Sequence, residues 1–182
     1  MMSRPASNTT THTTTRTTYL LLFILILSAG SLIAAIVLQH QWQLAPCPLC
    51  IIQRYALWLC GLAALRQLLA PEVNPRLVHG VMALGAVGGL ATALRQQWVI
   101  AHPTISCGMD PLETALNKLL FAQWWPTMFK ADGLCSAELP LLLGISIPLW
   151  ALLTFIALTI VCIVNLLTYS SLRSHSSTRT TA

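Results

Sequence analysis

The sequence predicts an all-α integral membrane protein, a bundle of four transmembrane helices with a long outer loop that contains a short interfacial helix. Of the 182 residues, 55% are hydrophobic and 8% are charged, whereas a soluble domain carries about 25% charged residues. Four stretches reach the roughly 20 apolar residues that a spanning helix needs. Arg residues gather on one side of these stretches, which orients the bundle.

The four spans are expected at about residues 19–38, 49–69, 77–98 and 147–168. The first has a longer apolar stretch than a cleaved signal peptide and lacks a clear cleavage site, so we expect it to stay as a helix. Pro140 and Pro148 predict an irregular entry into the fourth span. The tails, residues 1–18 and 169–182, are rich in Thr or Ser and are predicted to be disordered.

The positive charges predict that both termini are cytoplasmic. The residues on that side are Arg4, Arg16, Arg66, Arg76, Arg173 and Arg179. Because Lys and Arg are retained on the cytoplasmic side, the loops at about residues 39–48 and 99–146 are expected to face outward. The few basic residues form no stripe along the sequence, so we expect no nucleic-acid partner.

The six cysteines divide into two groups. Four lie in the outer loops or at their membrane edge: Cys47, Cys50, Cys107 and Cys135. An outer compartment permits disulfides, whereas the cytosol generally does not. Cys60 and Cys162 lie in the middle of spans, where cysteine usually acts as a small hydrophobic residue. The chemistry is therefore expected in the outer loops.

A C-x-x-C motif, Cys47-Pro48-Leu49-Cys50, opens the second span. Pro suits a first helical turn, so Cys50 is expected near the helix N-terminus, whose partial positive charge favours a thiolate. Arg54 follows four residues later and shares a helical face with Cys50. A charged residue inside a span is a functional candidate. The motif therefore predicts a reactive thiol pair.

Other interpretations of these residues remain. A zinc site needs four ligands; His40 and His102 are available, but Cys107 and Cys135 form no second C-x-x-C. Two inert structural disulfides are a second alternative, and Arg54 as a simple membrane-edge anchor is a third. We favour the redox interpretation because a C-x-x-C at a helix N-terminus is typical of a reactive couple.

The long outer loop contains a helix start at Asp110-Pro111-Leu112-Glu113, with Asp as the cap and Pro in the first turn. Apolar residues then recur on one face: Leu112, Leu116, Leu119 and Leu120. This spacing predicts a short amphipathic helix on the membrane surface, followed by an aromatic anchor at Trp124-Trp125. A helix that simply packs against the bundle is the alternative.

From the first span to the end of the fourth, the chain resembles the disulfide bond formation protein B (DsbB) family of bacterial inner-membrane thiol oxidases. The similarity depends on four blocks of sequence. They are Gln39-His40 with Pro46-Cys47-Pro48-Leu49-Cys50 and Arg54; Ser106-Cys107; Trp125-Pro126, Phe129 and Asp132-Gly133-Leu134-Cys135; and residues 143–150. Four cysteines on a four-helix frame make the pattern specific, whereas a C-x-x-C alone does not.

The resemblance implies two disulfides, Cys47–Cys50 and Cys107–Cys135. A reduced periplasmic DsbA-like protein would attack the second, with Cys107 forming the mixed disulfide. Electrons would then pass to Cys47–Cys50. Cys50 would interact with a membrane quinone, either ubiquinone or menaquinone. The resemblance also implies a periplasmic active site in the bacterial inner membrane, and no metal is expected.

Three residues are expected near the quinone. By the resemblance, Arg54 lies beside it and supports the Cys50 thiolate. Arg95 and Gln96 end the third span on the same side, where either could reach the quinone oxygens, although both could instead only anchor the helix end. His40 is a possible proton donor. A vitamin K epoxide reductase-type oxidase and a metal-binding or transport membrane protein are the alternative functions, and the cysteine order favours DsbB.

Overall fold

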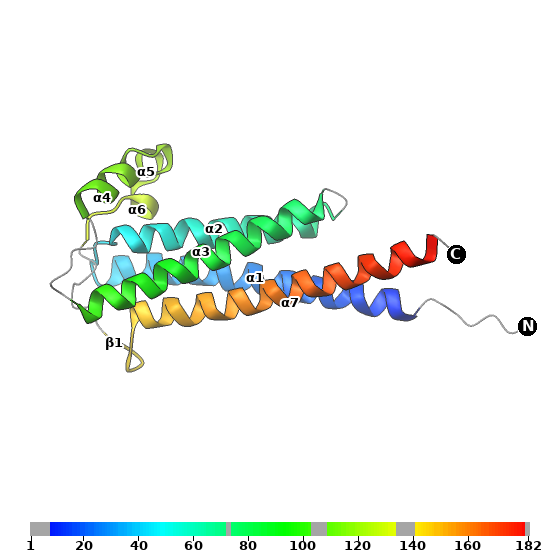
Figure 1. Ribbon diagram of the computed structural model, residues 1–182. Coiled ribbons are helices and arrows are strands. Elements are labelled where there is room, and N and C mark those ends of the chain that lie inside the picture. Colours follow the sequence, from blue (N-terminus) through cyan, green and yellow to red (C-terminus); the bar gives the residue numbers. More distant parts are fainter. Residues whose placement is uncertain (1–7, 72–73, 103–108, 134–140, 181–182) are drawn as a thin grey trace, which may run out of the picture.

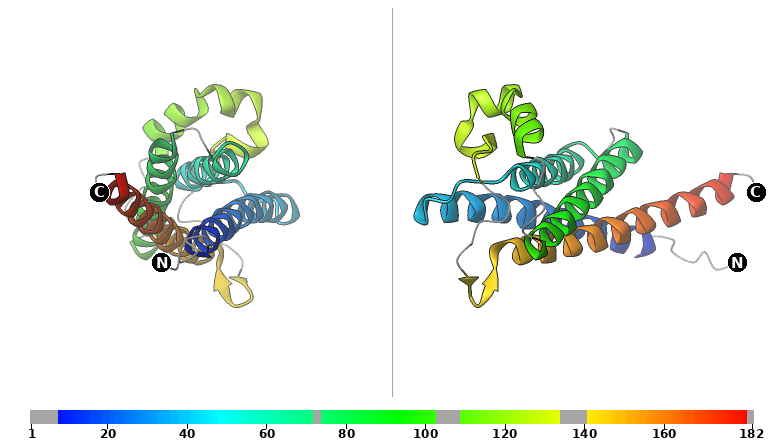
Figure 2. Two further views of the ribbon diagram at one scale, coloured as in Figure 1. Left: turned by 90° about the vertical axis from the view of Figure 1, so that its right-hand side faces the viewer. Right: turned by 60° about the vertical axis from the view of Figure 1, so that its left-hand side comes forward.

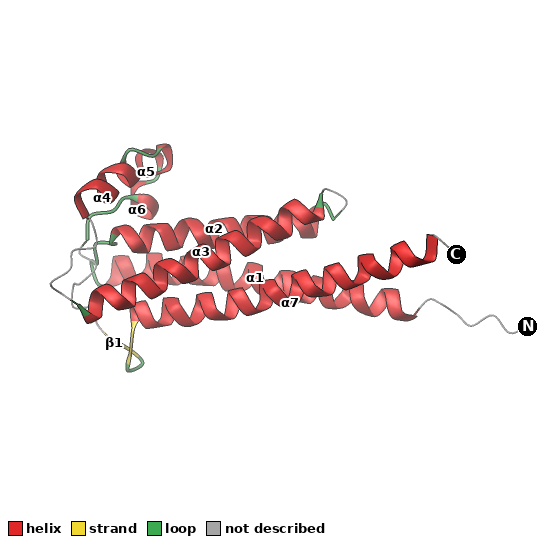
Figure 3. Cartoon of the chain, viewed as in Figure 1, coloured by secondary structure: helices red, strands yellow, loops and turns green. Residues whose placement is uncertain are grey.

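Four long helices make up most of the fold, which is described by a computed structural model for residues 8–71, 74–102, 109–133 and 141–180 (Figures 1 and 3). These helices are α1 Asn8–Gln41, α2 Pro48–Leu69, α3 Pro75–Ala101 and α7 Ile147–Thr180. Each contains a segment long and apolar enough to cross a membrane: Thr15–Gln41, Pro48–Leu69, Pro75–Ala101 and Ile147–Tyr169. The predicted all-α, four-span fold class is confirmed.

The helices form a ring in the order α1, α2, α3, α7, in which α7 closes against α1 (Figure 2). Small residues at the centre of the bundle allow the backbones to approach closely; they include Ala56, Ala64, Ala86 and Ala93. Cys60 and Cys162 are buried there, and both sulfurs face the carbonyl oxygen of Met82, at 3.5 and 4.0 Å. The prediction that these two cysteines belong to the core is confirmed.

The remaining elements gather at one end of the bundle, at the left of Figure 1. They are α4 Met109–Asn117, α5 Leu120–Trp124, α6 Pro126–Phe129, and the strands β1 Leu141–Leu142 and β2 Ile145–Ser146. The three short helices and the hairpin lie on opposite sides of this end (Figures 1 and 2). The start of α1 and the end of α7 lie at the other end. The cytoplasmic location of that end stays a prediction.

The short helix α4 packs against the bundle. Leu116 is buried against Ile51 of α2, and Leu112 packs in the same cluster. The apolar residues that follow are largely exposed: Leu119, Leu120, Phe121, Trp124 and Trp125. The first half of the predicted apolar face is therefore used for packing. Contact of the second half with the membrane surface stays a prediction.

The entry into α7 is more regular than expected. β1 and β2 form an antiparallel hairpin, in which Leu142 pairs with Ile145. Its two turn residues, Leu143 and Gly144, have φ of 55° and 81°, the positive values that a two-residue hairpin turn of type I′ requires. Pro148 lies in the first turn of α7, where its missing N–H is tolerated. Pro140 lies outside the described residues.

The tails also differ from the prediction. The disordered tails were expected at residues 1–18 and 169–182, but α1 already begins at Asn8 and α7 continues to Thr180. Extending an existing helix adds one hydrogen bond per residue without a new nucleation step. The long apolar spans therefore carry the helical conformation into tails whose composition alone does not favour it.

We expect Gly89→Ala to destabilise the packing of α3 against α7. A Cβ at Gly89 would overlap the ring of Phe155, which is 1% exposed. Overpacking of this kind costs about 1–3 kcal/mol, so the thermal unfolding midpoint in detergent should fall. Gly88→Ala is the matched control, because a Cβ there meets nothing within 4 Å. Equal midpoints for the two variants would contradict this packing.

Candidate active site

Cys47 and Cys50 lie at the N-terminus of α2, as the sequence predicts. Cys47 is the N-cap, and its sulfur accepts a hydrogen bond from the Cys50 backbone N–H at 3.3 Å. The two sulfurs lie 2.7 Å apart, and both residues are free cysteines. The pKa of the Cys47 thiol is raised, because it hydrogen-bonds to Cys50 and because it is buried. This geometry makes Cys50 the better thiolate, and the disulfide between the pair stays a prediction.

Two glutamine side chains form a hydrogen-bonded chain that ends at the sulfurs. Gln96 of α3 donates from Nε2 to Cys50 Sγ at 3.3 Å and to Cys47 Sγ at 3.7 Å. Gln53 of α2 donates from Nε2 to Gln96 Oε1 at 2.7 Å. Both glutamines are buried, with exposed fractions of 5% for Gln53 and 2% for Gln96. The thiol pair therefore lies on a buried, uncharged hydrogen-bonding chain.

Arg54 is buried one turn beyond Cys50, and its described partners are neutral oxygens. Nη1 donates to the carbonyl oxygens of Met128 at 2.9 Å and Thr127 at 3.4 Å. Nη2 donates to Gln39 Oε1 at 2.8 Å. A buried charge needs such hydrogen bonds to offset the loss of water. The guanidinium thus joins the end of α1 and the segment α6 to α2.

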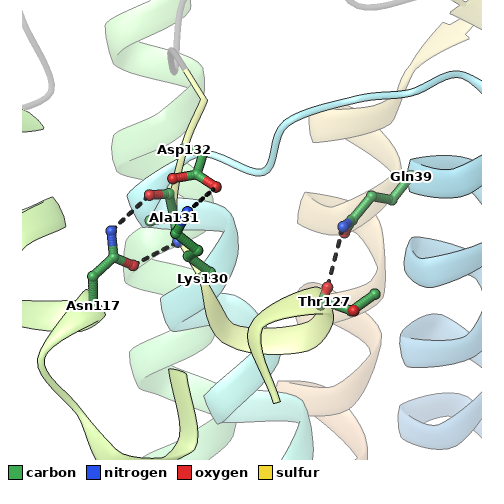
Figure 4. A network of polar contacts seen from close by, with 6 residues as sticks. All are labelled: Gln39, Asn117, Thr127, Lys130, Ala131 and Asp132. Carbon is green, nitrogen blue, oxygen red and sulfur yellow. Dashed lines mark hydrogen bonds and ion pairs between the residues drawn. The ribbon is translucent and has the colours of Figure 1, made fainter. Parts of the chain in front are cut away.

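The outer segment after α4 is held by a polar network (Figure 4). Gln39 donates from Nε2 to the Thr127 carbonyl oxygen at 3.1 Å. Asn117 donates from Nδ2 to the Ala131 carbonyl oxygen and accepts at Oδ1 from the Ala131 N–H, each at 2.8 Å. Lys130 and Asp132 form an exposed ion pair at 3.1 Å. Gln39 therefore ties Thr127 to α1, and Asn117 ties Ala131 to α4.

The same segment meets the chain directly before the C-x-x-C. The backbone N–H groups of Asp132 and Gly133 both donate to the carbonyl oxygen of Pro46 at 3.1 Å. A Cβ at Gly133 would overlap the Ala45 carbonyl group, so this approach requires glycine. Residues 132 and 133 of the outer segment thus contact Pro46, the residue directly before Cys47. Cys107 and Cys135, and therefore their predicted disulfide, lie outside the described residues.

A cavity of about 500 Å³ opens between α1 and α7 beside the sulfurs. Its walls are mostly apolar, and they include Leu27, Leu38, Leu142, Trp150 and Phe155. Its polar side chains are Ser31, Gln39, Cys47, Cys50, Gln53, Arg54, Gln96 and Thr154. The cavity therefore suits an apolar ligand with a few polar atoms, which would lie against the thiol pair.

The structure brings Cys47, Cys50, Arg54 and Gln96 together, but not Arg95. The Arg95 side chain is exposed, and its guanidinium carbon lies 4.6 Å from the centre of the Trp98 ring. His40 is also exposed and does not line the cavity. Neither the binding of quinone by Arg95 nor proton donation by His40 gains support from this arrangement.

Sequence reasoning assigned no role to Gln39 or Gln53. Gln53 follows Cys50 by three residues, and this spacing places both on one helical face. Gln39 belongs to a block that carries the family resemblance, but its contact with Arg54 joins two different helices. A polar amide inside an apolar span was the available signal for Gln53.

Comparison with known proteins identifies the family of this chain. The sequence profile of the family described as "Disulfide bond formation protein DsbB" matches residues 16–165. The chain belongs to the DsbB family. Curated relatives named "Disulfide bond formation protein B" come from Herminiimonas arsenicoxydans, Ralstonia nicotianae and Cupriavidus metallidurans. This DsbB-family chain is therefore a multi-pass membrane protein of disulfide bond formation, with the chemistry of a disulfide oxidoreductase.

The similarity to these DsbB proteins extends over most of each chain. Identity to the Herminiimonas protein is 43% over 129 residues, which covers 71% of this chain and 82% of the relative. The Ralstonia protein is 39% identical over 143 residues, which covers 78% of this chain and 89% of the relative. The Cupriavidus protein is 41% identical over 142 residues, covering 78% and 88%.

We expect Asn117→Ala to loosen the outer segment next to Pro46. The substitution removes both bonds to Ala131, and lost hydrogen bonds of this kind cost about 1–3 kcal/mol. Amide hydrogen exchange at residues 131–133 should become several-fold faster. Gln123→Ala is the matched control, because Gln123 is exposed and donates only to the nearby Lys118 carbonyl. Unchanged exchange in Asn117→Ala would show that Asn117 does not hold the segment.

Proposed function

We propose that this protein is a quinone-dependent thiol oxidase of the bacterial inner membrane. It reoxidises a periplasmic DsbA-like dithiol protein and passes the electrons through two disulfides to a membrane quinone. The observation that carries the proposal is the position of Cys50, which combines a helix N-terminus, a partner thiol and a largely apolar cavity.

The first part of the reaction is thiol–disulfide exchange. A thiolate of the soluble partner attacks the Cys107–Cys135 disulfide, and Cys107 forms the mixed disulfide. The partner's second thiol then resolves this bond, so that its dithiol becomes a disulfide while Cys107 and Cys135 become thiols. A second exchange passes the two electrons to Cys47–Cys50. The bonds from Asp132 and Gly133 to Pro46 support a short path between the two pairs.

The residues around the cavity fit a quinone. Apolar walls from α1 and α7 suit a flat ring and a lipid tail, and polar groups at the sulfur end suit the two ring oxygens. Arg54 and Gln39 would hold an oxygen, and Cys50 would face the ring. A quinone supplies a two-electron, two-proton acceptor, matching the electrons and protons that a dithiol loses when it forms a disulfide.

The chain's own groups prepare Cys50 for this reaction. Cys47 keeps its proton and donates a hydrogen bond to the Cys50 sulfur, whose negative charge is also favoured by the α2 N-terminus. Arg54 adds a fixed positive charge within the same cavity lining. Burial of Cys47 and Gln96 limits the competition of water for these hydrogen bonds.

A metal-binding or transport protein is the alternative from another class. It predicts that the outer cysteines stay free thiols and bind metal, whereas the redox proposal predicts two disulfides. Thiol titration before and after reduction separates them. Among the residues that the structure describes, no group of three or more His, Cys, Asp or Glu side chains is placed to hold a metal ion. A vitamin K epoxide reductase-type oxidase is the alternative from the same class, but the C-x-x-C opens the second helix and the second cysteine pair follows it, an order that favours DsbB.

The test of the proposal uses detergent-purified protein, a reduced DsbA-like protein and a soluble ubiquinone analogue, with quinone absorbance followed over time. We expect quinone consumption only when the partner is present. Cys50→Ser and Cys107→Ser should each lower the rate at least 100-fold, because a serine hydroxyl cannot replace a thiolate in exchange. Cys162→Ser is the control and should retain activity.

If folded wild-type protein consumed neither ubiquinone nor menaquinone analogues, the metal-binding or structural alternatives would replace the oxidase. If consumption persisted in Cys107→Ser, the outer disulfide would have no part in the relay.

We further expect Arg54→Ala to raise the apparent quinone KM much more than Arg54→Lys, because a lysine keeps a positive charge at the polar end of the cavity. Arg95→Ala should leave the KM unchanged, since Arg95 lies exposed on Trp98. Steady-state rates over a range of quinone concentrations measure all three variants. A negligible effect of both Arg54 variants would exclude a quinone-binding role for this residue.

A further inference from the structure

We propose that Gln53 and Gln96 form a positioning pair for the Cys50 sulfur, in which Gln96 donates to the sulfur and Gln53 fixes the direction of the Gln96 amide. The inference deepens the proposed function, because it concerns the reactivity of the same thiol. It also departs from the expectation that Gln96 binds the quinone oxygens.

The amide of Gln96 is already used in the site. Its Nε2 lies 3.3 Å from Cys50 Sγ and 3.7 Å from Cys47 Sγ, and its Oε1 accepts from Gln53 at 2.7 Å. An amide nitrogen has two N–H groups and its oxygen accepts. With both ends engaged on protein groups, Gln96 serves the sulfurs and has little left to offer a ligand in the cavity.

The direction of the amide decides its effect. An N–H facing a sulfur stabilises a thiolate, whereas a carbonyl oxygen facing the same sulfur opposes one. Rotating the Gln96 amide would exchange these two groups, and both groups have similar shape. Gln53 prevents the exchange because its Nε2 needs an oxygen from Gln96. Gln53 thus acts on Cys50 through Gln96, without touching the sulfur itself.

The pair is neutral in a site that already holds titratable groups. Cys47 and Arg54 share the cavity lining with Cys50. The other polar side chains of the lining are neutral: Ser31 and Gln39 of α1, Gln53 of α2, Gln96 of α3 and Thr154 of α7. The ion pair of Lys130 and Asp132 is exposed. A buried amide gives no titration of its own, so its support for Cys50 persists across the pH range in which the thiols react.

Two substitutions of Gln53 test the direction of the amide. Gln53→Glu keeps the shape but turns the donor into a carboxylate acceptor, which should rotate Gln96 and aim its oxygen at Cys50. Gln53→Met removes the donor and leaves the Gln96 amide free to rotate. Gln96→Met removes the bond to the sulfur. Gln97→Met is the matched control, since Gln97 is the next residue of α3 and does not line the cavity.

The readout is the pH dependence of Cys50 alkylation by iodoacetamide in the reduced, full-length protein, resolved by peptide mass spectrometry. It uses neither quinone nor partner protein, so failure of the inference and failure of the proposed function are distinguishable. We expect Gln53→Glu and Gln96→Met to move the alkylation midpoint upward by about one pH unit, the size expected for one lost charge-assisted hydrogen bond. Gln53→Met should give a smaller upward shift.

A merely structural role predicts another pattern, in which Gln53→Glu and Gln53→Met lower the unfolding midpoint but leave the alkylation profile equal to that of Gln97→Met. That result would overturn the proposal. A shift in Gln96→Met with none in either Gln53 variant would overturn the part assigned to Gln53. Gln53→Met keeps the test decisive if the carboxylate variant does not fold, because it adds no charge.

Discussion

The architecture of the outer end depends on one buried guanidinium. Arg54 lies inside a membrane span, where its charge must be satisfied by fixed oxygens because water is scarce. Those oxygens come from Gln39 at the end of α1 and from the backbone of α6 at Thr127 and Met128. Satisfying the charge therefore draws three segments together. Their meeting point forms the polar end of the cavity and sets the position of the outer segment.

The groups around the thiol pair are mostly uncharged hydrogen-bond donors. Its surroundings offer a helix N-terminus, two glutamine amides and a single guanidinium, and no carboxylate lines the cavity among the residues that the structure describes. Negative charge on Cys50 thus meets donors on several sides. The C-x-x-C is ordinary in sequence, and its reactivity is set by which groups the neighbouring helices bring to it.

Hydropathy and motif spacing predicted the four spans, the placement of Cys50 at a helix start and the core position of Cys60 and Cys162. These features depend on residues close together in sequence. The contacts of Gln39 and Gln96 depend on how separate helices are rotated about their axes, which weakly amphipathic spans do not specify. Arg95 and Gln96 are neighbours in sequence, yet the Arg95 side chain is exposed whereas the Gln96 side chain is buried, with an exposed fraction of 2%. Only the packed bundle distinguishes them.

The cavity walls come from the first and last spans, α1 and α7. During synthesis the C-x-x-C therefore leaves the ribosome well before the second wall of its chamber exists. Until α7 inserts, the cavity beside the two thiols lacks the wall that Trp150 and Phe155 supply. A chain truncated before Ile147 would retain its cysteines but lack one wall of the cavity. The cavity is therefore completed only when the last helix has been made.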